Sequence, residues 1–242
     1  MSSVPDRPRA GVARRGIVTV VVLASWLGCS RGAPSGGDVT DQLTHESRAI
    51  LLDPTHPAWS EPAPDTADVR FETSKGGFTI RVVRAWAPLG ADRFVNLVRH
   101  GYYDDARFHR TVPDFIVQWG LAGDPEVTAA WRGRTLADDP VVGVGNTRGR
   151  VAFAFTEPGT RDTQVFVSLV DLSRLDGQGF SPFGEVVQGM EVVDSLHSGY
   201  GETSGGGMRA GAQDSVALGG NRYLDAHFPR LDRIIRARIV AR

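Results

Sequence analysis

Short stretches of the chain alternate between apolar and polar residues, and this pattern predicts β-strands. Two of these stretches, at 69–73 and 78–82, flank a Ser-Lys-Gly-Gly turn at 74–77. Successive side chains of a strand point to opposite faces, so the alternation places one apolar face of each stretch against a core. Two such stretches joined by a turn that contains Gly predict a β-hairpin.

Further stretches predict strands at 115–119, 151–155, 165–169, 183–187 and 234–240. Helical spacing occurs in two segments. The first begins at Pro88, a favoured position for proline, and ends at Gly101, while the second follows Gly189 and continues to Leu196. About seven or eight short strands with two helices and many turns indicate a mostly β protein. They favour a sandwich or a closed barrel whose ends the two helices would cap.

The segments between these elements have other compositions. Residues 53–68 contain four prolines, which exclude regular structure there. Residues 121–148 are polar and rich in turn-forming residues, and residues 198–220 are rich in Gly. Both are therefore predicted to be surface loops. A short helix is predicted at 223–228.

The N-terminus carries the features of a secretory signal. Several Arg residues precede an apolar run at 17–27, and Gly28 precedes Cys29, the one Cys of the chain. The run is shorter than the roughly 20 residues that a membrane span needs. The pattern predicts a signal peptide at 1–28 and resembles that of a bacterial lipoprotein, with lipid on Cys29 and a flexible tether at 29–68. The alternative is an ordinary signal peptide to which Cys29 is incidental.

This N-terminus predicts an exported protein of the periplasm or cell envelope, in contact with a membrane only through the lipid.

The chain has 242 residues, of which 41% are hydrophobic and 23% charged, so we expect one folded domain at 69–242. A net charge of −1 gives no reason to expect a nucleic-acid partner. A single Cys excludes an internal disulfide, and the paired Asp residues have no His at metal-ligand spacing. No metal or cofactor is expected.

The stretch at 107–120 combines polar groups with an apolar surface. Alternation places Ile116 and Gln118 on one face of a strand, opposite Phe115, Val117 and Trp119. Arg110 precedes a turn at Pro113, so it can approach the face of Gln118 from a neighbouring strand. A guanidinium, an amide and an apolar floor together can bind and polarise a peptide group, and they offer no nucleophile. The alternative is a plain hairpin with a solvated Arg.

With these motifs in order, the chain resembles the cyclophilin family of peptidyl-prolyl cis–trans isomerases over about residues 69–242. The motifs are FHRTVPDFIVQ at 108–118, Ala154 followed by TQVFV at 163–167, LDG at 175–177, FGEV at 183–186 and GMEVVD at 189–194. The resemblance implies an eight-stranded antiparallel β-barrel closed by a helix at each end. It also implies that the protein accelerates rotation about Xaa-Pro peptide bonds without a cofactor.

The resemblance assigns roles to individual residues. Arg110 matches the catalytic Arg of the family, and Gln118 matches the Gln that holds the substrate backbone. The floor and walls of the proline pocket correspond to Phe115, Ile116, Phe166 and Leu175, and further site positions to Ala154 and Gln164. The family's His at the pocket edge has no counterpart, and Phe180 is expected to occupy that wall.

Two further departures, Phe155 for a frequent Asn and Arg174 for a frequent Trp, bear on drug binding more than on catalysis. The main hypothesis is a monomeric isomerase acting on proline-containing segments of exported proteins and assisting their folding. The alternative, motivated by Phe155 and the missing His, is a holdase that binds proline peptides with little or no turnover. A barrel for an unrelated small molecule is a third hypothesis, which the pairing of Arg110 with Gln118 disfavours.

Overall fold

The structure is a computed structural model in which residues 46–204 and 213–240 are described. Eight strands form one antiparallel sheet with the order β3-β4-β6-β5-β7-β2-β1-β8, which confirms the predicted strand architecture. The strands are β1 (Thr66–Thr73), β2 (Gly76–Val83), β3 (Arg110–Val112), β4 (Ile116–Trp119), β5 (Arg150–Phe153), β6 (Val165–Ser168), β7 (Pro182–Gln188) and β8 (Ile234–Val240).

The two edge strands of the sheet, β3 and β8, approach each other through the residues that precede them. Arg107 forms an isolated antiparallel bridge with Arg233. The Ile234 N–H donates to the Ala106 carbonyl at 2.8 Å. The curled sheet is thus joined at this seam by one bridge and adjoining hydrogen bonds. The neighbouring strands elsewhere in the described sheet are joined by ladders.

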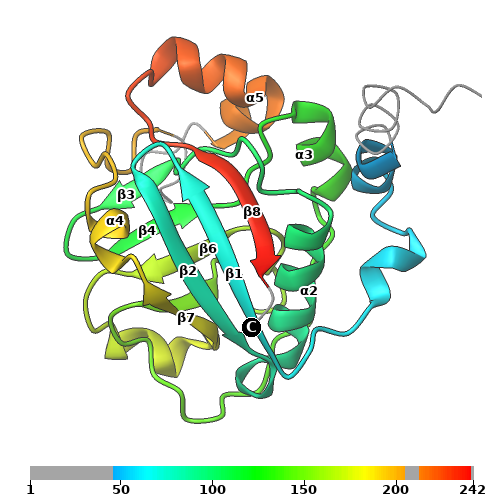
Figure 1. The fold of residues 1–242 in the computed structure, drawn as a ribbon, viewed down its shortest axis with the longest axis vertical. Helices are drawn as coiled ribbons and strands as arrows, with labels where there is room; N and C mark the ends of the chain where they lie inside the picture. Colours follow the sequence, from blue (N-terminus) through cyan, green and yellow to red (C-terminus); the bar gives the residue numbers. More distant parts are fainter. Residues whose placement is uncertain (1–45, 205–212, 241–242) are drawn as a thin grey trace, which may run out of the picture.

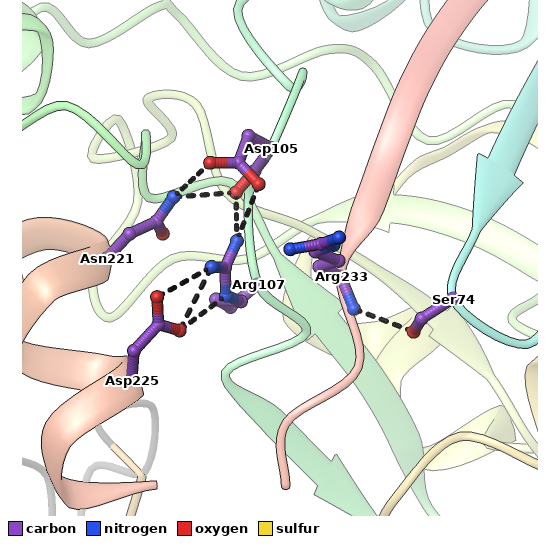
Figure 2. Close-up of polar contacts among 6 residues, drawn as sticks. All are labelled: Ser74, Asp105, Arg107, Asn221, Asp225 and Arg233. Carbon is purple, nitrogen blue, oxygen red and sulfur yellow. Dashed lines mark hydrogen bonds and ion pairs between the residues drawn. The ribbon is translucent and has the colours of Figure 1, made fainter. Parts of the chain in front are cut away.

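Arg107 ties helix α5 (Gln213–His227) to the seam. Its guanidinium is 5% exposed and donates to both carboxylate oxygens of Asp225, at 2.9 and 3.0 Å through Nη2. Its Nη1 lies 2.9 Å from Asp105 Oδ1, and Asn221 Nδ2 donates to Asp105 Oδ2 at 2.8 Å (Figure 2). Two side chains of α5 therefore hold the segment that leads directly into β3.

Aromatic rings fill the interior of the sheet. Phe71 and Phe78, which face each other on β1 and β2, stack with their ring centroids 4.9 Å apart. Trp119 meets both rings edge-on, at 5.6 and 6.4 Å, and Phe94 of helix α2 (Pro88–Arg99) packs on Phe71. All four side chains are fully buried. Burial of each Phe side chain contributes about 1.5–3 kcal/mol, so the strand alternation and the apolar stripe of α2 together stabilise this core.

Helix α2 begins and ends as the sequence indicates. Pro88 opens its first turn, and Gly101 follows it with a φ of 74°. Asp139 accepts hydrogen bonds from the N–H groups of Leu89 and Gly90, both at 2.8 Å. A carboxylate at a helix N-terminus satisfies free N–H donors and interacts favourably with the helix dipole. In Figure 1, α2 runs beside β8.

Helix α3 (Pro125–Trp131) lies within residues 121–148, so the prediction of a surface loop throughout that range was wrong. Asp124 caps the helix by accepting from the Glu126 N–H at 2.9 Å. Val127 and Trp131 are buried on one face. The helix has seven residues, which is too short for the apolar period to stand out from the surrounding polar sequence.

Helix α5 begins inside the predicted Gly-rich loop at 198–220 and extends through the short helix expected at 223–228. Gly220, with a φ of 54°, interrupts the regular helix and explains why the two halves have separate sequence signals. Figure 1 shows α3 next to α5. Helix α4 (Met190–Asp194), one of the two expected caps, has five residues. The described fold thus has more helical structure than the two predicted caps.

The described part of the predicted tether packs against the domain. Residues 46–52 are helical, a 3₁₀ turn spans Pro57–Ser60 and β1 begins at Thr66, so the prediction that residues 53–68 have no regular structure was wrong. Trp59 meets Trp131 edge-on with centroids 4.6 Å apart, and its carbonyl accepts from Asn96 Nδ2 at 2.9 Å. Cys29 and the predicted signal peptide lie outside the described residues. In the part of the chain that is described, no helix has the length and apolar character to cross a membrane.

Candidate active site

The β3–β4 hairpin places the two predicted catalytic residues opposite each other. Arg110 pairs with Gln118 in the antiparallel register, and Arg110 Nη1 donates to Gln118 Oε1 at 3.0 Å. Gln118 Nε2 in turn donates at 3.0 Å to Oε1 of Gln164, the residue directly before β6. The turn between the strands contains Asp114 with a φ of 56°. A guanidinium and two amides are therefore joined in one chain of hydrogen bonds.

These groups border a cavity of about 930 Å³. Its lining draws on the β3–β4 hairpin, β6 and the segments that follow β5 and β6. All the residues assigned from the family resemblance line it, namely Arg110, Phe115, Ile116, Gln118, Ala154, Gln164, Phe166, Leu175 and Phe180. Residues that are far apart in the sequence are therefore brought together in one pocket.

The floor of the cavity is an apolar cluster separate from the main core. Ile116, Phe166 and Leu175 are buried in it, and Phe115 packs against it. Phe115 was predicted on the opposite face from Ile116. However, β4 begins at Ile116, and Phe115 follows the positive-φ residue Asp114. Strand alternation therefore does not extend to Phe115, and its side chain joins the pocket.

An aromatic pair forms the far wall. Phe180 stacks on Phe155 with ring centroids 4.1 Å apart and an interplanar angle of 20°, and it meets Phe166 edge-on at 5.8 Å. The predicted strand at 151–155 ends two residues early, because β5 stops at Phe153. Phe155 is consequently free of the strand alternation and faces Phe180. Phe155 stands where the family often has an Asn, and Phe180 lies at the wall where the family has a His. These two departures thus form one pair of stacked rings.

Charged side chains surround Phe115. The guanidinium carbon of Arg110 lies 5.4 Å from the ring centroid, and that of Arg174 lies 4.7 Å from it.

Glu202 forms an ion pair with Arg110 through Nη2 and also lines the cavity. Sequence reasoning missed Glu202, because it lies 92 positions after Arg110 in a Gly-rich segment without a recognisable motif.

His109 adjoins Arg110 in the chain and is buried, with 1% of its surface exposed. Burial lowers the pKa of His109 to about 4, and the positive charge of Arg110 acts in the same direction. The imidazole is therefore neutral at pH 7 and belongs to the interior. Among residues 46–204 and 213–240, His, Cys, Asp and Glu side chains form no group of three that could hold a metal ion.

The arrangement suits binding and polarisation of an amide. A guanidinium stays charged at all relevant pH values and presents donors in a fixed plane. Beside an apolar cavity its electrostatic effect on a bound group is stronger than in water, because the local dielectric constant is lower. The site can therefore hold an apolar ring in the cavity and direct N–H groups at an adjacent peptide bond.

Known proteins are similar to this chain in sequence and in fold. The family model described as cyclophilin type peptidyl-prolyl cis-trans isomerase/CLD matches residues 68–214. A peptidyl-prolyl cis-trans isomerase of Arabidopsis thaliana is 35% identical over 144 residues, covering 57% of this chain and 85% of the plant protein. One of Acinetobacter baylyi is 32% identical over 137 residues, covering 53% of this chain and 70% of the bacterial protein.

The fold has a counterpart among solved structures. A crystal structure of a Cryptosporidium parvum cyclophilin type peptidyl-prolyl cis-trans isomerase has a TM-score of 0.54 at 21% identity, and covers 73% of this chain and 99% of that one. The curled eight-stranded sheet with its helices therefore has the cyclophilin-like fold. The chain belongs to the cyclophilin type peptidyl-prolyl cis-trans isomerase family, and it is an enzyme of that class.

Proposed function

We propose that the protein accelerates rotation about Xaa-Pro peptide bonds in exported polypeptides and so assists their folding, with Arg110 stabilising the twisted bond. The observation that carries the proposal is the 3.0 Å hydrogen bond from Arg110 Nη1 to Gln118 Oε1 at the wall of the apolar cavity. It supports a guanidinium with a defined orientation beside a space suited to a proline ring.

The chemistry requires electrostatics and positioning only. Rotation about a peptide bond has a barrier of about 18–20 kcal/mol because the amide resonance is lost. For Xaa-Pro bonds the uncatalysed exchange takes tens to hundreds of seconds. As the bond twists, the proline nitrogen becomes pyramidal and gains a free lone pair. A donor directed at that nitrogen binds the twisted state more strongly than the planar one, which lowers the barrier.

Other residues have supporting roles in this proposal. Gln118 positions the substrate backbone while it orients Arg110, and Gln164 orients Gln118. The apolar floor at Ile116, Phe166 and Leu175 binds the pyrrolidine ring. The Cryptosporidium parvum protein has also been crystallised in the presence of the dipeptide Ala-Pro. That structure supports proline-containing peptides as the ligand class for this chain.

The cellular setting of the proposal comes from the N-terminal sequence. The basic and apolar run before Cys29 supports export, and a lipid on Cys29 would hold the monomeric enzyme at the cell envelope. The test is the mass of the mature protein extracted from membranes. We expect the N-terminus to begin at a lipid-modified Cys29 and Cys29→Ser to release the protein. An unmodified Cys29 in a membrane-free protein would contradict the anchor.

Turnover separates the isomerase from the holdase alternative. The rate of cis–trans exchange of an Ala-Pro peptide is measured by exchange NMR at equilibrium, and its affinity by titration calorimetry on the same protein sample. We expect binding together with exchange accelerated in proportion to enzyme concentration. Binding with an unaccelerated exchange rate would instead identify a proline-binding holdase.

A further inference from the structure

Arg110 is fixed from three directions. Gln118 accepts from its Nη1, Glu202 accepts from its Nη2, and the ring of Phe115 lies beside the guanidinium carbon at 5.4 Å. Gln118 and Phe115 come from the hairpin that carries Arg110, so they constrain one side of it. Glu202 comes from the segment between α4 and α5 and accepts from the other terminal nitrogen of the guanidinium.

The segment that carries Glu202 is anchored on both sides of it. Ser204 is 1% exposed, and its hydroxyl donates to the carbonyl oxygen of His109, the residue before Arg110. On the other side, the ring of Tyr200 lies 5.0 Å from His197 and 5.2 Å from Phe228, centroid to centroid. These anchors hold the carboxylate of Glu202 at Arg110.

We propose that Glu202 is a positioning residue for the isomerisation, which holds the guanidinium of Arg110 in the orientation that reaches the proline nitrogen. This inference rests on the catalytic role proposed for Arg110. A free Arg side chain has many rotamers, and the one hydrogen bond that Arg110 donates to Gln118 leaves the guanidinium plane able to rotate. The second acceptor removes that freedom before the substrate binds, so less of it is lost in the transition state.

The ion pair leaves donors for the substrate. A guanidinium has five N–H groups, and Gln118 and Glu202 accept from different nitrogens of Arg110. Donors therefore remain on the same rigid plane for the amide. Glu202 acts through the orientation of Arg110, so its loss should change kcat more than KM.

The test compares Glu202→Ala and Glu202→Gln with the wild-type protein, with kcat and KM measured separately on an Ala-Pro peptide. We expect Glu202→Ala to lower kcat about tenfold with KM within about twofold, and Glu202→Gln, which keeps a neutral acceptor, to lose about threefold. Asp194→Asn is the matched control, because its carboxylate pairs with Arg148 at 2.6 Å outside the cavity lining. That variant should keep wild-type kcat.

A side-chain NMR signal provides a second readout. The Arg110 Nε–Hε signal should broaden or shift in Glu202→Ala and remain as in the wild type in Asp194→Asn. Wild-type or raised kcat in Glu202→Ala would overturn the inference, and so would an unchanged Arg110 signal. If Arg110→Ala abolishes activity while Glu202→Ala has no effect, the inference alone fails. Full activity of Arg110→Ala would instead refute the proposed role of Arg110.

Discussion

Phe180 stacks on Phe155 with ring centroids 4.1 Å apart, which links two positions that both depart from the cyclophilin pattern. Neither substitution is isolated, because each ring covers the other at the edge of the cavity. Phe180 also contacts Phe166 of the floor. The two departures together therefore give a continuous aromatic wall in place of a polar rim.

This wall should contribute to substrate binding. Phe180→Ala and Phe155→Ala should each raise KM for an Ala-Pro peptide about three- to tenfold with a smaller effect on kcat, since an aromatic pair is worth about 0.5–1.5 kcal/mol beyond its buried area. The double variant should be little worse than either single one, because both remove the same contact. Leu218→Ala, at a side chain 77% exposed on α5, is the control. Unchanged KM in both single variants would contradict the role of the wall.

The hydrogen bonds that Arg107 donates to Asp225 and Asp105 should stabilise the fold. Arg107→Ala removes charged hydrogen bonds from a guanidinium that is 5% exposed, and we expect it to lower the free energy of unfolding by about 2–3 kcal/mol. Arg132→Ala is the matched control, because its pair with Asp214 is 67% and 81% exposed and should contribute less than about 1 kcal/mol. Urea denaturation measures both. Equal effects of the two variants would refute a special role for the seam.

Amide hydrogen exchange shows which elements are destabilised in Arg107→Ala. Arg107, in the segment before β3, donates to Asp225 of α5, and Asn221 of α5 donates to the neighbouring Asp105 (Figure 2). Amides of α5 should therefore exchange faster in Arg107→Ala than in the wild type, while those of the β1–β2 hairpin should change less. Uniform acceleration over all elements would show that the variant destabilises the fold without releasing α5.

His109 should make stability depend on pH. Its folded pKa of about 4 lies below the value of about 6.5 expected in the unfolded chain. Between these values the unfolded state binds more protons, so stability falls as pH decreases from 6.5 to 4, by about 3 kcal/mol in total. In His109→Gln this contribution is absent. Urea unfolding of both proteins between pH 7 and pH 4 measures the difference, and parallel curves would contradict it.

The sequence predicts the sheet well where strands have one buried face. The β1–β2 hairpin has alternating apolar residues and a Gly-containing turn, and the structure confirms it. Helix α2 is equally clear, because Pro88 and Gly101 mark its ends. In these places local propensity and burial favour the same structure, so a local pattern is sufficient.

The cavity could be assembled only through the family resemblance. Leu175 and Phe180 come from segments whose own sequence resembles ordinary core or turn residues. Phe115 was assigned to the wrong face by alternation, because a positive-φ turn displaces it from β4. Glu202 has no local signal at all, since its position depends on the anchors at Tyr200 and Ser204. Contacts made between distant segments leave no periodic pattern in the sequence.

The activity of Arg110→Ala is the most direct test of the role of Arg110 in isomerisation. Exchange NMR on an Ala-Pro peptide gives its rate beside that of the wild type and of Arg174→Ala, whose guanidinium also lies against Phe115 but is not assigned a catalytic role. We predict that Arg110→Ala lowers kcat/KM at least about 100-fold, as for loss of a donor to a developing charge, while Arg174→Ala stays within about fivefold. Arg110→Ala with near wild-type kcat/KM in a folded protein would contradict a catalytic role for Arg110.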